Sequence, residues 1–141
     1  MNAAEITLVQ NSFSKIVPVA GPAAALFYAR LFELDPSLRP LFHGDMTEQG
    51  NKLMQVLALA VGSLERLATV LPAVRQLGVK HVAYGVKESH YETVGEALLW
   101  TLEKGLGDDF TPAVRAAWAK TYALFADTMK DAARGAQAAA A

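Results

Sequence analysis

The sequence predicts an all-α fold, and three observations carry this prediction. Apolar residues recur at every third or fourth position wherever the chain is regular, and β-branched residues are too sparse for strands. Capping residues, prolines and glycines divide the chain into six substantial helical segments. With 141 residues, 52% hydrophobic and 19% charged, the chain is long enough for one buried core. We therefore expect one domain over residues 1–134 and an Ala-rich tail over residues 135–141.

Capping and proline signals bound the first two helices. Asn2 is followed three residues later by Glu5, which matches a capping box, and the helix that they open is predicted to end near Pro18. A second helix is predicted over residues 22–34. It ends there because Asp35 precedes a proline, and a residue in that position is pushed out of the helical region.

The middle of the chain predicts a long helix and a shorter one. After a short helical turn that ends at residues 40–42, Thr47 can cap a third helix with a wide apolar stripe. Pro72 is predicted to begin a shorter helix that reaches Gly78 or slightly beyond, and Gly85 closes this segment. The apolar stripe of the third helix comprises Leu53, Val56, Leu57, Ala60, Leu64 and Leu67.

Two further helices are predicted in the C-terminal part. Ser89 and Glu92 match a second capping box, and the helix that they open is predicted to end at Gly107. Thr111 precedes Pro112, which marks the start of the last helix because proline is tolerated at the first helical position. Six substantial helices, one short connecting turn and no internal repeat favour an irregular helical sandwich over an up-and-down bundle.

Composition excludes several classes of function. Thirteen basic and 14 acidic residues leave a net charge of −1, and no basic run could follow a phosphate backbone, so nucleic acid is not an expected partner. The absence of cysteine removes disulfides, thiolate nucleophiles and Cys-ligated zinc or iron–sulfur sites. No basic residue precedes an apolar stretch at the N-terminus, and the most apolar run, residues 56–62, is far shorter than the ~20 residues of a membrane span. We expect a cytoplasmic protein without a membrane span.

The three histidines, His43, His81 and His90, show no metal-chelating spacing, so a zinc site built from side chains is not expected. His81 lies in an apolar setting late in a short helix, where Leu77 and Tyr84 share its face if the helix continues. Taken alone, His81 is either a partly buried structural histidine or an axial haem ligand whose second nitrogen donates a hydrogen bond. His43 is expected to face the solvent.

Four ordered motifs resemble those of bacterial single-domain globins, a group that includes Vitreoscilla-type haemoglobin, Hell's Gate-type globins and the haem domain of flavohaemoglobins. The similarity covers almost the whole chain, up to about Met129. It implies a three-over-three globin fold that holds haem b. The motifs are Phe27-Tyr28-X-X-Leu31-Phe32, Pro36-X-X-Arg39-Pro40-Leu41-Phe42, Val79-Lys80-His81-X-X-X-Gly85 and His90-Tyr91-X-X-Val94-Gly95.

The resemblance also implies a role for each candidate site residue. His81 would be the proximal iron ligand, and Tyr28 and Gln49 would line the distal side. The register of Gln49 stays open by one residue, because the start of its helix is not fixed by the sequence. The other implied haem contacts are Phe42 flat on the porphyrin, Leu53 on the ligand pocket, Lys80 at a propionate, Tyr91 on the proximal side, and Leu77 and Tyr84 on the helix face of His81.

These roles imply a protein that binds dioxygen, and also nitric oxide and carbon monoxide. A hydrogen bond from the Tyr28 hydroxyl to the bound ligand would be worth ~1.5–3 kcal/mol, roughly ten- to a hundredfold in affinity. We expect tight, reversible oxygen binding at a five-coordinate ferrous iron, suited to transport or scavenging.

Three alternatives stay open at this point. The first is a nitric oxide dioxygenase served by a separate reductase, since no reductase sequence follows the globin-like part. The others are a six-coordinate electron-transfer protein and a sensor without haem. Counting from Trp118 places Ala133 where the family often carries a proximal glutamate, and this departure argues against strong peroxidase behaviour.

Overall fold

A computed structural model describes residues 1–140, with side chains up to residue 136. The six α-helices of this part confirm the prediction of an all-α fold. They are α1 (Ala3–Ile16), α2 (Ala20–Leu34), α3 (Met46–Gly62), α4 (Leu67–Ala83), α5 (Glu88–Leu106) and α6 (Pro112–Ala140). Short 3-10 helices connect them: η1 (Val17–Val19), η2 (Pro36–Leu41), η3 (Leu64–Arg66) and η4 (Gly107–Asp109).

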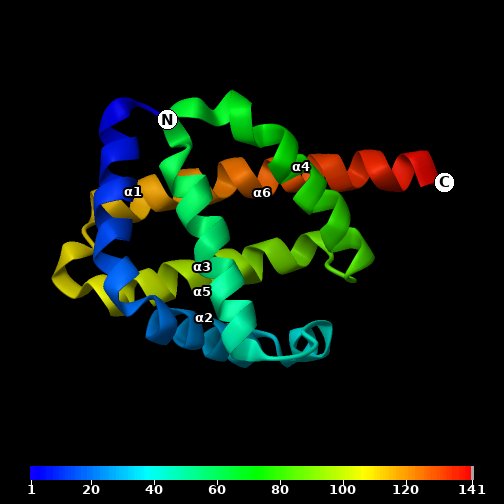
Figure 1. The fold of residues 1–141 in the computed structure, drawn as a ribbon, viewed down its shortest axis with the longest axis horizontal. Helices are drawn as coiled ribbons and strands as arrows, with labels where there is room; N and C mark the ends of the chain where they lie inside the picture. The colour runs from blue at the N-terminus through cyan, green and yellow to red at the C-terminus, as the bar shows by residue number, and fades with distance from the viewer. Residues whose placement is uncertain (141) are drawn as a thin grey trace.

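The helices form two layers that cross each other. In Figure 1, α1, α3 and α4 cross over a layer made by α2, α5 and α6. Helix α1 packs on α6, α2 packs on α5 and α3, and α4 packs mainly on α6. Trp118 of α6 is almost fully buried at the contact with α1, where its indole N–H donates to the Ser12 hydroxyl at 2.8 Å. The core therefore lies at the crossing of the layers.

Helices α3 and α4 diverge after a break at Ser63. Their axes are bent by 58°, and they pack on different partners, α3 on α2 and α1 and α4 on α6. The predicted stripe that continued to Leu67 is therefore wrong, because the helix ends at Gly62. The apolar face of α3 is left only partly covered, and Val56 is 46% exposed. This uncovered apolar face matters for the site below.

Four predicted helix starts are wrong, each by a few residues, and the first is that of α2, which begins at Ala20 instead of residue 22. The cap of α3 is Asp45, whose carboxylate accepts from the Thr47 N–H at 2.7 Å. Helix α4 begins at Leu67 and accommodates Pro72 inside it. Helix α5 begins at Glu88, and Ser89 is not its cap. There the backbone N–H of Lys87 donates to Nδ1 of His90 at 3.0 Å, so this donor at the start of the helix has a hydrogen-bond partner.

Helices α1 and α2 run almost continuously from Ala3 to Leu34, and by length and composition this stretch could cross a membrane. It is longer than the apolar run over residues 56–62 that the sequence singled out. In the fold its apolar side packs on α5 and α6, which is the environment of a core helix in a globular protein.

Glu5 ties the start of α1 to α6. It completes the predicted capping box with Asn2, which is confirmed, and it pairs with Lys120 at 2.6 Å. The bond from Lys120, and then the backbone N–H at Asn2, lower the pKa of Glu5 below 4.5.

The Glu5 contribution to stability should therefore be present above pH 4.5 and lost as the pH falls through the lowered pKa. We expect the unfolding free energy of the native chain, measured with urea, to fall more steeply below this pH than that of Glu5→Gln. If the unfolding free energies of the two proteins changed with pH in parallel, the pair of Glu5 with Lys120 would contribute nothing to stability.

Candidate functional site

An aromatic cluster at the end of α2 surrounds Tyr28, which is only 6% exposed. Its ring centroid lies 5.0 Å from that of Phe27 and 5.3 Å from that of Phe42, both edge to face. Phe32 completes the cluster at 5.4 Å from Phe42. Phe42 follows η2, so the proline-rich turn returns this ring to the face of α2. The structure thus brings together Tyr28 and Phe42, two residues that the sequence predicts for one site.

Gln49 lies in the first turn of α3, half-buried, next to the hydroxyl of Tyr28. Burial raises the pKa of Tyr28, and a hydrogen-bonding interaction with the Gln49 side chain only partly opposes this shift. The phenol therefore stays protonated and can act as a donor.

The register of Gln49 is set by its neighbour Gly50. A Cβ at this position would lie 3.0 Å from the Cβ of Ala24, so a glycine lets α3 cross α2 closely. Gly50 is buried in that crossing and Glu48 on the other side is exposed, which leaves Gln49 facing Tyr28. Leu53, one turn later, is half-buried and packs against the core cluster.

His81, near the end of α4, is held in one orientation by its own helix. Its Nδ1 lies 2.7 Å from the carbonyl oxygen of Leu77. Since a carbonyl only accepts, Nδ1 carries the proton, and in the neutral ring Nε2 keeps its lone pair. Burial lowers the pKa of His81 below 6.5, so the neutral form prevails at neutral pH. A metal-ligating histidine has this protonation state, and its other ring N–H typically donates to a carbonyl oxygen in this way.

Gly78 positions this segment of α4 against α6. A Cβ at residue 78 would lie 2.4 Å from the carbonyl oxygen and 2.7 Å from the Cα of Met129. Helix α4 does continue through Gly78, as the shared face of Leu77 and His81 requires. The close approach is between backbones, so no side-chain rotation can relieve it.

We therefore expect Gly78→Ala to destabilise the protein by about 1–3 kcal/mol, the usual cost of overpacking. Gly62→Ala is the matched control, because nothing lies within 4 Å of a Cβ there. This control should be neutral or slightly stabilising, since alanine is the better helix former. Urea unfolding measures both variants, and equal stability would contradict the packing argument.

Lys80 and Tyr84 lie on the outer face of the same helix end. Lys80 is exposed, and Tyr84 is 60% exposed although its ring centroid is 6.0 Å from that of His81. The structure therefore does not bring these two predicted haem contacts into the buried part of the site. His43 is exposed, as predicted.

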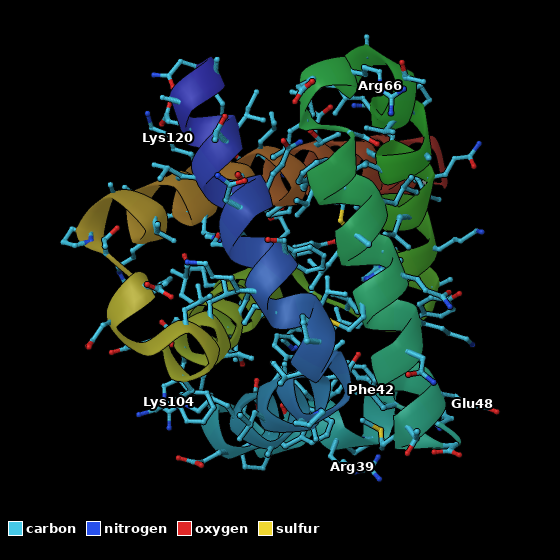
Figure 2. All side chains as sticks on the ribbon, turned by 60° about the vertical axis from the view of Figure 1, so that its left-hand side comes forward. Arg39, Phe42, Glu48, Arg66, Lys104 and Lys120 are labelled. Carbon is cyan, nitrogen blue, oxygen red and sulfur yellow. The ribbon has the colours of Figure 1, made fainter. Side chains whose placement is uncertain are left out.

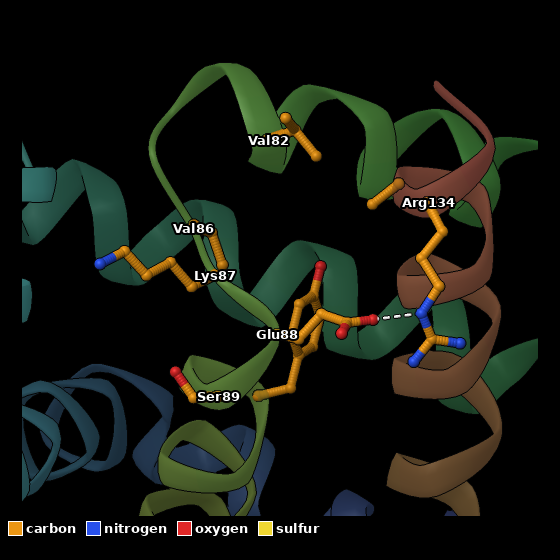
Figure 3. Close-up of a pocket in the computed structure, with 8 residues that line it drawn as sticks. Val82, Val86, Lys87, Glu88, Ser89 and Arg134 are labelled. Carbon is orange, nitrogen blue, oxygen red and sulfur yellow. Dashed lines mark hydrogen bonds and ion pairs between the residues drawn. The ribbon is translucent and has the colours of Figure 1, made fainter. Parts of the chain in front are cut away.

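A cavity of about 350 Å³ lies between the end of α4, the start of α5 and α6. Tyr91 and Ala133, both nearly buried, line it, and Figure 3 shows the ion pair of Glu88 with Arg134 at its side. Burial, and then the charge of Glu88, raise the pKa of Tyr91. The position of the expected glutamate thus carries only a methyl group.

Sequence reasoning missed the groups that hold this region together. The Tyr122 hydroxyl donates to the carbonyl oxygen of Tyr91 at 2.5 Å, and burial raises the pKa of Tyr122. Its ring lies where a Cβ on Gly95 would intrude, at 2.8 Å. Tyr122 lies on α6, and helical periodicity alone could not name its partner on α5.

The described side chains fit a flat apolar group that carries a metal. They contain no group of three or more His, Asp or Glu side chains that could hold a metal ion. The half-covered apolar face of α3, the Phe42 ring and the free Nε2 of His81 are the surfaces that such a group needs.

The model of the globin family matches residues 25–129. The chain is a globin. It is 32% identical over 136 residues to the neuroglobins of Tetraodon nigroviridis and of Chaenocephalus aceratus, and the match covers 86% of this chain and 86% of each relative. It is 36% identical over 106 residues to the flavohemoprotein of Bacillus subtilis, which covers 72% of this chain but only 26% of that protein. The predicted globin fold is confirmed.

As a globin, the protein binds haem b and, through it, diatomic ligands. His81, Phe42, Tyr28 and Gln49 stay the predicted contacts of this haem and its ligand, and the structure places Phe42 and Gln49 beside Tyr28. The globin is similar both to neuroglobins and to a flavohemoprotein, so the comparisons establish the globin family without the narrower bacterial group named by the resemblance.

Proposed function

We propose that this globin binds dioxygen reversibly and tightly at a five-coordinate ferrous iron. The observation that carries the proposal is the buried Tyr28 hydroxyl beside the Gln49 side chain, on the opposite flank of the site from α4. When bound, the haem supplies an iron whose open position takes the diatomic ligand.

On the proximal side, His81 presents Nε2 while Leu77 fixes its ring through Nδ1. The other two histidines are engaged elsewhere or exposed: His90 accepts the Lys87 N–H, and His43 faces the solvent. This arrangement supports a vacant sixth position rather than closure by a second imidazole.

On the distal side, the Tyr28 hydroxyl would donate a hydrogen bond to a bound diatomic ligand that carries partial negative charge. The donor is pre-positioned by the aromatic rings around it, so little entropy is lost when the bond forms. The Gln49 side chain lies beside this hydroxyl and would offer its own amide N–H as a second donor. Both groups slow release of the ligand more than its arrival.

The rate of oxygen dissociation tests this proposal. It is measured in a stopped-flow instrument, in which carbon monoxide displaces the bound oxygen. We expect slow release from the native protein and release about two- to tenfold faster from Gln49→Leu, the effect of one hydrogen bond of ~0.5–1.5 kcal/mol. Glu48→Gln is the control, because Glu48 is exposed and should leave the rate unchanged. Fast release from the native protein would overturn the proposal.

A second candidate function is nitric oxide dioxygenation, which the similarity to a flavohemoprotein favours. In this reaction one nitric oxide, one dioxygen and one electron would give one nitrate ion, and an external donor would supply the electron. The same Tyr28 and Gln49 would retain dioxygen until nitric oxide arrives. Stoichiometric nitrate from the oxygenated protein would support this use, and nitric oxide that leaves dioxygen unconsumed would exclude it.

A further inference from the structure

An exposed patch surrounds the C-terminal end of α4. It consists of Val79, Lys80, Tyr84 and Lys87, and we call it the Tyr84 patch. Tyr84 is 60% exposed and Val79 42%, and Tyr84 is the one aromatic among the large apolar side chains that are exposed in the described residues. An aromatic side chain held in water is typical of a contact surface.

The charge of the patch is positive. Lys80 and Lys87 are exposed, and neither forms an ion pair within the part of the chain that the structure describes. Nearby carboxylates are occupied: Glu88 pairs with Arg134, and Asp131 pairs with Arg75 at 2.9 Å. Figure 3 shows the Lys87 side chain extending away from the Glu88–Arg134 pair. On a chain of net charge −1, these two lysines form a local field that attracts an acidic surface.

The patch is also adjacent to the proposed iron ligand. The rings of Tyr84 and His81 are 6.0 Å apart between centroids and tilted by 55°. The exposed Tyr84 ring therefore lies close to the half-buried imidazole of His81. A partner seated on Tyr84 would place its own redox group near His81 without entering the buried site.

We propose that the Tyr84 patch docks an acidic electron-transfer protein, a reduced flavoprotein or iron–sulfur protein. One electron leaves the reduced centre of the partner and converts the ferric iron of the globin to ferrous, with no bond or proton transferred. This inference rests on the proposed function, because a globin whose iron becomes oxidised must be reduced again. Lysines around an aromatic centre suit a protein partner, in which charge steers the encounter and the aromatic side chain anchors it.

The test uses the haem-loaded ferric protein and an acidic FMN flavodoxin as the probe. Calorimetric binding is measured with both proteins oxidised, and the rate of haem reduction is then measured with the reduced flavodoxin. Lys87→Glu is compared with Arg115→Glu, an equal charge change at an exposed residue of α6 outside the patch. Reduction by dithionite and the unfolding midpoint check that both variants are intact.

We expect Lys87→Glu to weaken binding at least about tenfold at low salt and to slow reduction by flavodoxin in parallel, whereas Arg115→Glu changes both by less than about twofold. Added salt should weaken native binding towards the level of the variant. Tyr84→Ser should weaken binding at high salt as well, and Tyr84→Phe should restore it.

Equal effects of Lys87→Glu and Arg115→Glu, or binding that ignores salt, would overturn the inference. Preferential binding to anionic phospholipid vesicles over flavodoxin would overturn it in favour of a membrane surface. The binding arm does not involve oxygen, so docking can hold when tight oxygen binding fails. The reverse result, tight oxygen binding with no docking, leaves the proposed function standing alone.

Discussion

Replacement of His81 by glycine is expected to abolish stable haem binding. His81 offers the free Nε2 described above, and no other histidine lies in the buried part of the site. Loss of a group that only hydrogen-bonds to a metal ligand usually costs about 10–100-fold in metal affinity. Loss of the ligand itself should therefore cost more than about 100-fold. Haem affinity is measured by absorbance titration with haemin, and by the rate of transfer to an excess of a haem scavenger.

Added imidazole gives this experiment a positive control. The small ring should fill the space left in His81→Gly and restore both the absorbance spectrum and slow haem transfer. His43→Gly should behave like the native protein, since His43 is exposed. A His81→Gly variant that keeps native affinity without imidazole would show that another residue ligates the iron.

Replacement of Tyr28 by phenylalanine is expected to accelerate oxygen dissociation roughly ten- to a hundredfold, the value of a hydrogen bond of ~1.5–3 kcal/mol. The ring packing of Tyr28 with Phe27 and Phe42 should persist, because phenylalanine differs only by the hydroxyl. Carbon monoxide serves as the internal control, since it carries little negative charge and accepts a weaker hydrogen bond. Equal acceleration for both ligands would indicate a changed pocket shape instead of a lost donor.

The fold was predictable where the signal is local. The capping box of Asn2 and Glu5 and the cap by Thr111, whose hydroxyl accepts from the Val114 N–H at 3.2 Å, each involve residues three apart. The break at Ser63 was not predictable, because apolar spacing continues through it. Only the packing of α3 on α2 and of α4 on α6 makes the two helices diverge.

The candidate site was also predictable only where its contacts are local in sequence. Leu77 and His81 are four residues apart, so a helix alone brings them into contact. The pairs Glu88 with Arg134 and Tyr91 with Tyr122 join α5 to α6, and helical periodicity does not specify partners across helices. The exposure of Tyr84 was not predictable either, because its apolar neighbours in sequence suggested a buried position.

The most direct test of the central account is the visible absorption spectrum of the haem-loaded protein after reduction with dithionite under nitrogen, and again after exposure to oxygen. We expect one haem per chain, a five-coordinate ferrous spectrum, and a long-lived oxygenated form that returns to the ferrous spectrum when oxygen is removed. A six-coordinate ferrous spectrum that oxygen does not change would contradict the account, because an internal side chain would then occupy the position that Tyr28 and Gln49 are proposed to serve.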